Sequence, residues 1–416
     1  REQGRQAAAM TPTRRALATT LALTAALATA PAAQAADTPQ HPWYFDTLRV
    51  EEMWEHTTGE GITVAVIDTG VDPTLPELQG QVLDGTDVMR DARGSHADED
   101  GHGTDMASLI AGSGGSGVQG LAPGAKILPI RASTNQLDFD GGDRWAEAID
   151  FAVAEGARII NISLAATDNG TAATSMGDSI AEATRQGVLI FAGTGNDGDT
   201  YNTAKFPAAL DGIVGVGAVN SDGAREGYST HGSQVAIAAP GGNVPGHCDG
   251  PAGPACLREE GGTSSATALA SASAALIWSQ HPDWTKNQVL RVMLNTAERP
   301  DDQRRDDYTG YGIVRPDRVI IDGEGDPGDP DSPPIFRDWE AALDPAATPA
   351  PEPEAGTAPE TDADAGTEPA PGPEAEAATG ENSGPLPWIL GGTAAVLVVA
   401  VTGWAVIRRR SASAGA

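Results

Sequence analysis

The chain has 416 residues, and its 26 Lys and Arg residues against 58 Asp and Glu residues give a formal net charge of −32. This length is sufficient for one large domain with additional segments. Such an acidic composition argues against a nucleic-acid-binding protein, because nucleic acid requires a basic face.

The N-terminus has the three parts of a secretion signal. Arg14 and Arg15 form a charged region, and residues 16–30 form an apolar stretch that is too short to span a bilayer comfortably. Ala33-Gln34-Ala35 fits the cleavage site. We therefore predict that residues 1–35 are an N-terminal extension and signal peptide.

The central part of the chain is predicted to be one globular domain. Residues 36–60, polar with scattered aromatic residues, are predicted to be an N-terminal arm that lies on this domain, which covers residues 61–321. Short apolar runs alternate there with helical patterns, which predicts an α/β fold with a doubly wound, mostly parallel sheet and helices on both faces. The expected strands are 61–67, 127–131, 158–164, 188–192, 213–219 and 235–239, and the expected helices are 105–111, 143–155, 179–186, 267–275 and 285–296.

Two cysteines occur in a Pro- and Gly-rich loop of this domain. Cys248 and Cys256 are an even pair in a chain that carries an export signal, which favours a disulfide over two free thiols. The loop offers too few further ligands for a metal site.

The C-terminal part differs sharply in composition from the domain. Residues 322–386 are rich in Pro, Asp and Glu, and are predicted to be a disordered, extended linker. Residues 387–407 are uncharged, bear tryptophans at 388 and 404, and are predicted to be one transmembrane helix in the lipid bilayer. Residues 408–416 begin with three arginines and form a predicted basic cytoplasmic tail. Together with the signal peptide, this predicts a single-pass type I protein of the cell membrane with its large domain extracellular.

Four reactive side chains are predicted to meet at one edge of the sheet. Asp68 and Asn196 follow strands, where ligands of open α/β sheets gather, and His102 and Ser264 stand where loops open into helices. In acyl transfer, Ser264 would attack a carbonyl carbon, His102 would move its proton, Asp68 would orient the imidazole, and Asn196 would donate to the oxyanion. Singly, these residues also fit a helix cap, a turn acid or a left-handed turn residue, so it is their joint occurrence that carries the prediction.

The remaining polar motifs receive structural interpretations. The other histidines do not lie between two glycines, as His102 does, and are interpreted as surface or loop residues: His41, His56, His96, His231, His247 and His281. The acidic loops 98–100 and 138–143 could hold structural calcium. Neither has a full spacing of oxygen ligands, so we expect solvated loops and no metal or other cofactor.

Three motifs carry a resemblance to a known family. Asp68-Thr69-Gly70, His102-Gly103-Thr104 and Gly262-Thr263-Ser264-Ser265-Ala266 resemble, in this order, the signatures of the subtilisin-like serine peptidases, the subtilases of the S8 family. An α/β-hydrolase esterase is disfavoured because such enzymes order these residues Ser, Asp, His. The resemblance covers about residues 43–320 and implies a subtilisin-like fold and an endopeptidase acting on proteins or peptides.

The same resemblance implies substrate-binding residues. Gly193-Thr194-Gly195-Asn196 is similar to the family's oxyanion segment, and residues 161–165 are similar to the strand that lines its main specificity pocket. This assigns substrate binding to Ser163, Leu164, Ala165 and Gly193. Ala165 replaces a frequent Gly, and Thr267 replaces the Pro that usually follows the serine motif. Neither change removes a reactive group, so we expect activity that is slow or narrow in substrate range.

The arrangement of segments narrows the resemblance. A signal peptide, an acidic Pro-rich linker, one span and a basic tail resemble the mycosins, membrane-anchored subtilases associated with type VII secretion in actinobacteria. Only about 32 residues separate Ala35 from Asp68, which is short for a subtilisin propeptide and similar to the arm of the mycosins. This implies a peptidase that processes exported proteins, with secretion-system membrane components as partners. The alternative is a structural component that stabilises a type VII secretion complex, with proteolysis secondary.

Overall fold

The computed structural model describes residues 41–115, 117–135, 142–167, 172–248, 250, 253–299 and 304–343. These residues all belong to the first of the chain's two compact units, residues 1–350. The predicted signal peptide, most of the linker, the predicted span at 387–407 and the predicted tail lie outside the described residues. No helix among the residues described between 41 and 343 combines the length and the apolarity needed to cross a membrane.

Within the described residues, the central sheet has seven strands that all pair in parallel, in the order β2-β3-β1-β4-β5-β6-β7. Strands β2 and β3 lie on one side of β1 and strands β4 to β7 lie on the other, so the sheet is doubly wound, as predicted. The strands are β1 (Thr63–Asp68), β2 (Thr86–Asp87), β3 (Lys126–Arg131), β4 (Ile159–Ile162), β5 (Leu189–Gly193), β6 (Ile213–Val219) and β7 (Val235–Pro240).

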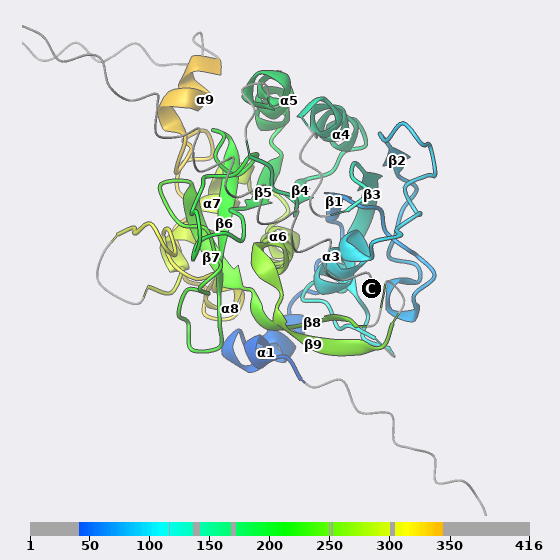
Figure 1. Cartoon of the computed structure of the whole chain (residues 1–416). Coiled ribbons are helices and arrows are strands. Elements are labelled where there is room, and N and C mark those ends of the chain that lie inside the picture. The colour runs from blue at the N-terminus through cyan, green and yellow to red at the C-terminus, as the bar shows by residue number, and fades with distance from the viewer. Residues whose placement is uncertain are drawn as a thin grey trace, which may run out of the picture. The chain divides into compact units, whose positions relative to one another are not determined.

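Helices cover both faces of this sheet, as Figure 1 shows. On one face lie α3 (His102–Ala111) and α6 (Gly262–Gln280), and on the other lie α4 (Gly142–Ala154) and α5 (Ala172–Arg185). Side chains alternate between the faces along each strand, so Val64 and Val66 join one core cluster while Ala65 and Ile67 join the other. The strand–helix alternation of the sequence is therefore confirmed.

The α6 helix runs through the centre of the larger core cluster. Its residues from Gly262 to Trp278 are all buried. Ala and Ser residues fill most of these positions, which lets α3 and the sheet approach its backbone closely. The predicted small-residue helix is thus longer than expected at both ends, and it includes the whole serine motif.

The remaining helices pack around the two core clusters. The N-terminal arm forms α1 (Trp43–Thr47) and α2 (Val50–Trp54), which bury Tyr44, Phe45 and Met53. Thr285 and Gln288 form a capping box at the start of α7 (Lys286–Thr296). The other short helices are η2 (Pro76–Leu78), α8 (Pro316–Ile320) and α9 (Arg337–Leu343).

Residues 322–343 differ from the predicted linker, because they pack on the domain. Asp322 pairs with Arg49 at 2.9 Å, Glu340 pairs with Lys286 at 2.9 Å, and Trp339 contacts the second core cluster. The composition of the whole stretch up to residue 386 concealed the few apolar side chains near its start. The linker prediction is therefore wrong for residues 322–343.

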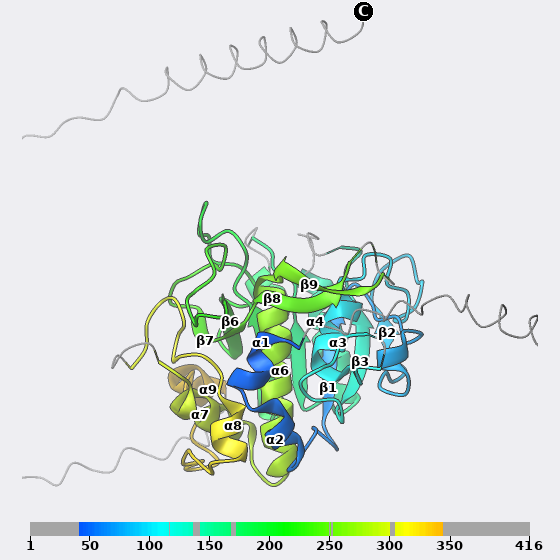
Figure 2. The same cartoon turned by 90° about the horizontal axis from the view of Figure 1, so that it is seen from below.

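A two-stranded antiparallel hairpin occupies the segment predicted to be a loop. It consists of β8 (Gly242–His247) and β9 (Ala255–Glu260), and Cys248 and Cys256 form a disulfide at its turn end. Figure 2 shows the hairpin running across α6 and α3. Its Gly and Pro content is untypical of strands, which is why the sequence pattern did not reveal it. At its base, Trp43 of the arm donates a hydrogen bond to the Gly242 carbonyl at 3.0 Å.

Candidate active site

The first two predicted residues form a buried pair at the end of the central strand. Asp68 ends β1, and its Oδ1 atom lies 2.7 Å from His102 Nδ1 and accepts the N–H of Thr69 at 2.8 Å. Because an ionised carboxylate only accepts hydrogen bonds, His102 Nδ1 is the donor, which leaves Nε2 as the basic nitrogen of a neutral ring.

Glycines allow α3 to begin beside β1. Gly101 precedes the helix in the left-handed region, at φ 88°, and a Cβ atom on Gly103 would collide with the main-chain oxygen of Gly70. The helix was predicted to begin at residue 105. It begins at His102 instead, so the imidazole projects from the first turn.

The pKa of His102 reflects two opposing effects. Burial alone would lower this pKa, but the charge of Asp68 and its hydrogen bond raise it, with smaller contributions from Asp105 and Asp100. The result is a pKa above the ordinary histidine value. The imidazolium form of His102 is therefore stabilised.

Asp98, in one of the two acidic loops, ties these segments together. Its carboxylate accepts hydrogen bonds from Thr69 Oγ1 at 2.8 Å, from the Gly101 N–H at 2.8 Å and from both the N–H and the hydroxyl of Thr104. Thr69 Oγ1 in turn accepts the Gly103 N–H at 2.9 Å. The sequence predicts a solvated acidic loop here, with a structural calcium site as the alternative. The structure adds that the Asp98 oxygens organise the loop before α3.

Ser264 lies in the first turn of α6, which packs against α3. Its Oγ donates to the main-chain oxygen of Ser163 at 3.0 Å, and Ser163 Oγ donates to the main-chain oxygen of Ser264 at 3.0 Å. Among the hydrogen bonds of the described residues, none joins Ser264 Oγ to His102. A rotation about the Cα–Cβ bond of Ser264 is the simplest movement that would turn the hydroxyl away from Ser163.

The residues predicted to bind substrate follow or end two neighbouring strands, β4 and β5. Ser163 and Leu164 follow β4 and are buried, Ala165 is partly buried next to them, and Gly193 ends β5. A Cβ atom on Gly193 would lie 3.0 Å from Thr263 Oγ1, so a larger residue at this position would require the first turn of α6 to shift slightly.

Asn196 is exposed, and Thr263 fixes the orientation of its side chain. The Oδ1 atom of Asn196 accepts the Thr263 N–H at 2.9 Å and the Thr263 hydroxyl at 3.0 Å. This identifies Nδ2 as the atom turned away from Thr263, and a Cβ atom on Gly262 would lie 3.0 Å from it. Thr263 was noted in the sequence only as part of the serine motif. Its hydrogen bonds to Asn196 could not be read from spacing, because they join residues 67 positions apart.

The interpretation of His247 as a surface or loop residue is wrong. His247 is buried between Glu77 and Asp105, with its two ring nitrogens 2.7 Å and 2.6 Å from their carboxylate oxygens. Glu77 and Asp105 lie 170 and 142 positions away from His247 in the chain, so no local pattern could have revealed these two contacts.

Known proteins are similar to this chain in sequence and in fold. The model of the subtilase family matches residues 59–312. Subtilisin E of Bacillus subtilis (strain 168) is 33% identical over 246 residues, which are 58% of this chain and 61% of that protein. The match thus spans about three fifths of the length of this curated relative.

Two solved structures are similar in fold. MycP1 from Mycobacterium smegmatis has a TM-score of 0.61 and 27% identity, over 71% of this chain and 88% of that chain. A structure described as a serine protease MycP1, an essential component of the type VII (ESX-1) secretion system, has a TM-score of 0.58 and 30% identity, over 68% and 89% of the two chains. Since the family model covers more than half of the sequence and includes the aspartate, histidine and serine motifs in order, this chain belongs to the subtilase family.

Proposed function

We propose that this protein is a membrane-anchored, extracellular serine endopeptidase that hydrolyses peptide bonds through Asp68, His102 and Ser264, with Asn196 in the oxyanion hole. The observation that carries the proposal is the buried Asp68–His102 pair at the start of α3, the helix that packs against the helix of Ser264. Membership of the subtilase family supports the same reaction.

The proposed reaction begins with attack by the serine. Ser264 Oγ leaves its hydrogen bond to Ser163, gives its proton to His102 Nε2, and forms a bond to the carbonyl carbon of the substrate. Asp68 accepts the Nδ1–H of His102 throughout, so it holds the tautomer and stabilises the imidazolium. His102 then returns the proton to the leaving amine, and water releases the acyl group from Ser264 by the same steps in reverse.

Two donors would stabilise the oxyanion of the tetrahedral intermediate. Thr263 holds the Asn196 amide so that Nδ2 is available to donate, and the Ser264 N–H belongs to the first turn of α6, where main-chain N–H groups have no helical partner. Ser163, Leu164, Ala165 and Gly193 would contact the substrate chain beside this site.

Hydrolysis of a peptide substrate tests the proposal. The folded domain should cleave a mixture of unstructured peptides, and Ser264→Ala should abolish cleavage while its thermal unfolding remains cooperative. Cleavage that is unchanged in Ser264→Ala would remove Ser264 from the mechanism.

The substrates and the membrane anchor form the second part of the proposal. We propose exported proteins as substrates, because the sequence predicts a signal peptide at residues 1–35 and one bilayer-spanning helix at residues 387–407. Mass spectrometry of protein N-termini from cells with the wild type and with Ser264→Ala would identify them. Substrate-derived termini should disappear in the variant.

A second candidate function is stabilisation of a type VII secretion complex, with proteolysis secondary. The similarity to MycP1, described as an essential component of such a system, favours this candidate. Ser264→Ala separates the two roles. Secretion that persists while cleavage stops would indicate a structural function, and loss of both would indicate that cleavage is the essential activity.

A further inference from the structure

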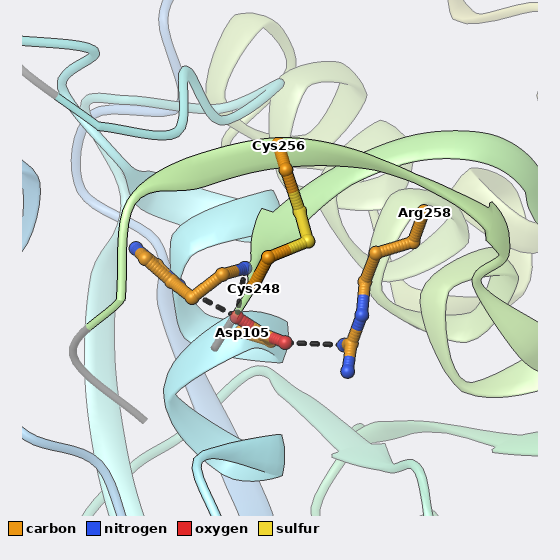
Figure 3. The surroundings of a disulfide bond; sticks show 5 residues. Asp105, Cys248, Cys256 and Arg258 are labelled. Carbon is orange, nitrogen blue, oxygen red and sulfur yellow. Dashed lines mark hydrogen bonds and ion pairs between the residues drawn. A yellow bond between two sulfur atoms is a disulfide. The ribbon is translucent and has the colours of Figure 1, made fainter. Parts of the chain in front are cut away.

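Asp105 lies one helical turn after His102 on α3 and is almost completely buried. Its Oδ1 atom accepts the main-chain N–H of His247 at 3.0 Å and is 2.6 Å from His247 Nδ1. Its Oδ2 atom accepts a hydrogen bond from the Arg258 guanidinium, which Figure 3 shows pointing back from the hairpin toward Asp105. One carboxylate on the histidine-bearing helix thus binds both strands of the hairpin.

A second carboxylate completes this group. His247 Nε2 lies 2.7 Å from Glu77 Oε1, and Glu77 is fully buried on η2. Since both carboxylates accept hydrogen bonds, both ring nitrogens of His247 donate, and the ring is an imidazolium. Glu77, His247, Asp105 and Arg258 therefore form a cluster of two negative and two positive groups, which we name the hairpin clamp.

The hairpin clamp holds the segment that leads into Ser264. Strand β9 ends at Glu260 and α6 begins at Gly262, so the hairpin leads directly into the first turn of α6, which contains Ser264. The Gly261 N–H donates to the Gly241 carbonyl at 2.9 Å and closes the base of the hairpin, while the Cys248–Cys256 disulfide closes its other end. A hairpin closed at both ends can transmit the position of its strands to the residues that follow it.

Resting on the proposed roles of His102 and Ser264, we propose that Asp105 is a positioning residue: it fixes the helix of His102 against the hairpin that carries the chain into Ser264. Releasing the hairpin would break the hydrogen bonds that His247 and Arg258 donate to the Asp105 carboxylate, and charge-assisted hydrogen bonds of this kind are about twice as strong as neutral ones. The two helices that bear the reactive groups are thereby kept in one relative position.

The hairpin clamp also contributes to the electrostatic field at His102, through Asp105. The charge of Asp105 is one of the influences that raise the pKa of His102, after Asp68 and beside Asp100. Arg258 on β9 and His247 on β8 oppose that charge, and Glu77 on η2 faces His247 from the other side. Removing Arg258 should therefore raise the pKa of His102, whereas removing the charge of Asp105 should lower it.

The test measures the rate at which a fluorophosphonate probe labels Ser264, as a function of pH. The use of this probe requires no knowledge of the natural substrate. The labelling rate falls at low pH as His102 becomes protonated, and we call this part of the pH profile the acid limb. Arg258→Met should move this acid limb upward by about 0.3 pH units and Asp105→Asn should move it downward by a similar amount. The plateau rate of Asp105→Asn should fall by about tenfold to a hundredfold, because a displacement of about 1 Å between reacting groups has an effect of that size. Arg258→Lys keeps the charge and should restore the wild-type limb.

A matched control separates positioning from stability. Lys286→Met breaks the Lys286–Glu340 ion pair, whose side chains are 11% and 17% exposed, beside the C-terminal end of α6 and away from Ser264. This variant should lower the melting temperature without moving the acid limb. Arg258 is 38% exposed in its side chain, so we expect Arg258→Met to fold even if Asp105→Asn does not. The comparison of Arg258→Met with Arg258→Lys then decides by itself.

The outcomes are distinguishable. Folded Arg258→Met and Asp105→Asn variants with the limb and plateau of the wild type would overturn the inference. Shifts of the same sign in both variants would overturn it as well, because they would reflect a general loss of structure. A wild-type protein that the probe does not label would refute the proposed function, which is a separate result.

Discussion

The stability of the domain should depend on the protonation of His247. Burial opposes the charged form, but hydrogen bonds and charges from Asp105 and Glu77 outweigh it and raise the pKa of His247 from 6.5 to about 9. A group with a raised pKa in the folded state contributes stability that is fully present below its unfolded pKa and is lost as the pH rises through its folded pKa. The contribution of His247 should thus be complete below pH 6.5 and absent above about pH 9.

The magnitude follows from the size of this change. A rise in pKa from 6.5 to about 9 corresponds to roughly 3 kcal/mol, and partial solvent screening lowers the figure to about 2 kcal/mol. For a domain of this size, this amounts to a decrease in melting temperature of about 4–8 °C between pH 7 and pH 10.

Calorimetry of two proteins isolates this effect. Both carry Ser264→Ala to prevent self-digestion, and one also carries His247→Gln, which places an uncharged amide at this position. The melting temperature of the protein that retains His247 should decrease from pH 7 to pH 10 by about 4–8 °C more than that of the protein with the His247→Gln substitution. Equal decreases in the two proteins would show that His247 is not held as a cation, and the assignment of the hairpin clamp would be wrong.

Four further predictions test other parts of the structure. Asn196→Ala should lower kcat on a peptide substrate by about 10²–10³-fold with little change in KM. Thr263→Val should lower kcat by about tenfold, because the Asn196 amide keeps one of its two hydrogen bonds to Thr263. An effect mainly on KM would contradict the roles of both residues. Gly103→Ala should destabilise the fold by about 2–4 kcal/mol in urea unfolding, because its methyl group meets main-chain atoms, whereas Gly177→Ala, with open space on α5, should stabilise it by about 0.5 kcal/mol. A chain that ends at residue 321 should have a lower melting temperature than one that ends at residue 343, since it lacks the contacts of residues 322–343. Equal melting temperatures would show that this segment does not stabilise the domain. Calcium chelation should leave the melting temperature and the peptidase rate unchanged, and a clear decrease in either would indicate a calcium site.

Much of the candidate site could be predicted because its residues stand at fixed places in local patterns. Asp68 follows a β-branched strand, and His102 and Ser264 open helices, so each is visible within a window of about ten residues. A parallel sheet then brings the ends of such segments to one edge. The doubly wound sheet followed from the same alternation of strands and helices.

The features that escaped prediction depend on contacts between distant segments. His247 gains its role only from Glu77 and Asp105, and Thr263 gains its role from Asn196. The β8–β9 hairpin carries Gly and Pro in place of alternating apolar residues, so its composition does not indicate that the two segments pair. The Cys248–Cys256 disulfide helps to hold the two strands together.

The central claim is that Ser264 is a nucleophile activated by His102, and mapping of the covalent probe adduct tests it most directly. After fluorophosphonate labelling of the folded domain, tandem mass spectrometry should locate one phosphonyl group on Ser264 Oγ. The adduct should be absent in Ser264→Ala and should form at least about 10³-fold more slowly in His102→Ala. An adduct on another residue, or labelling of Ser264 at an equal rate without His102, would contradict the account.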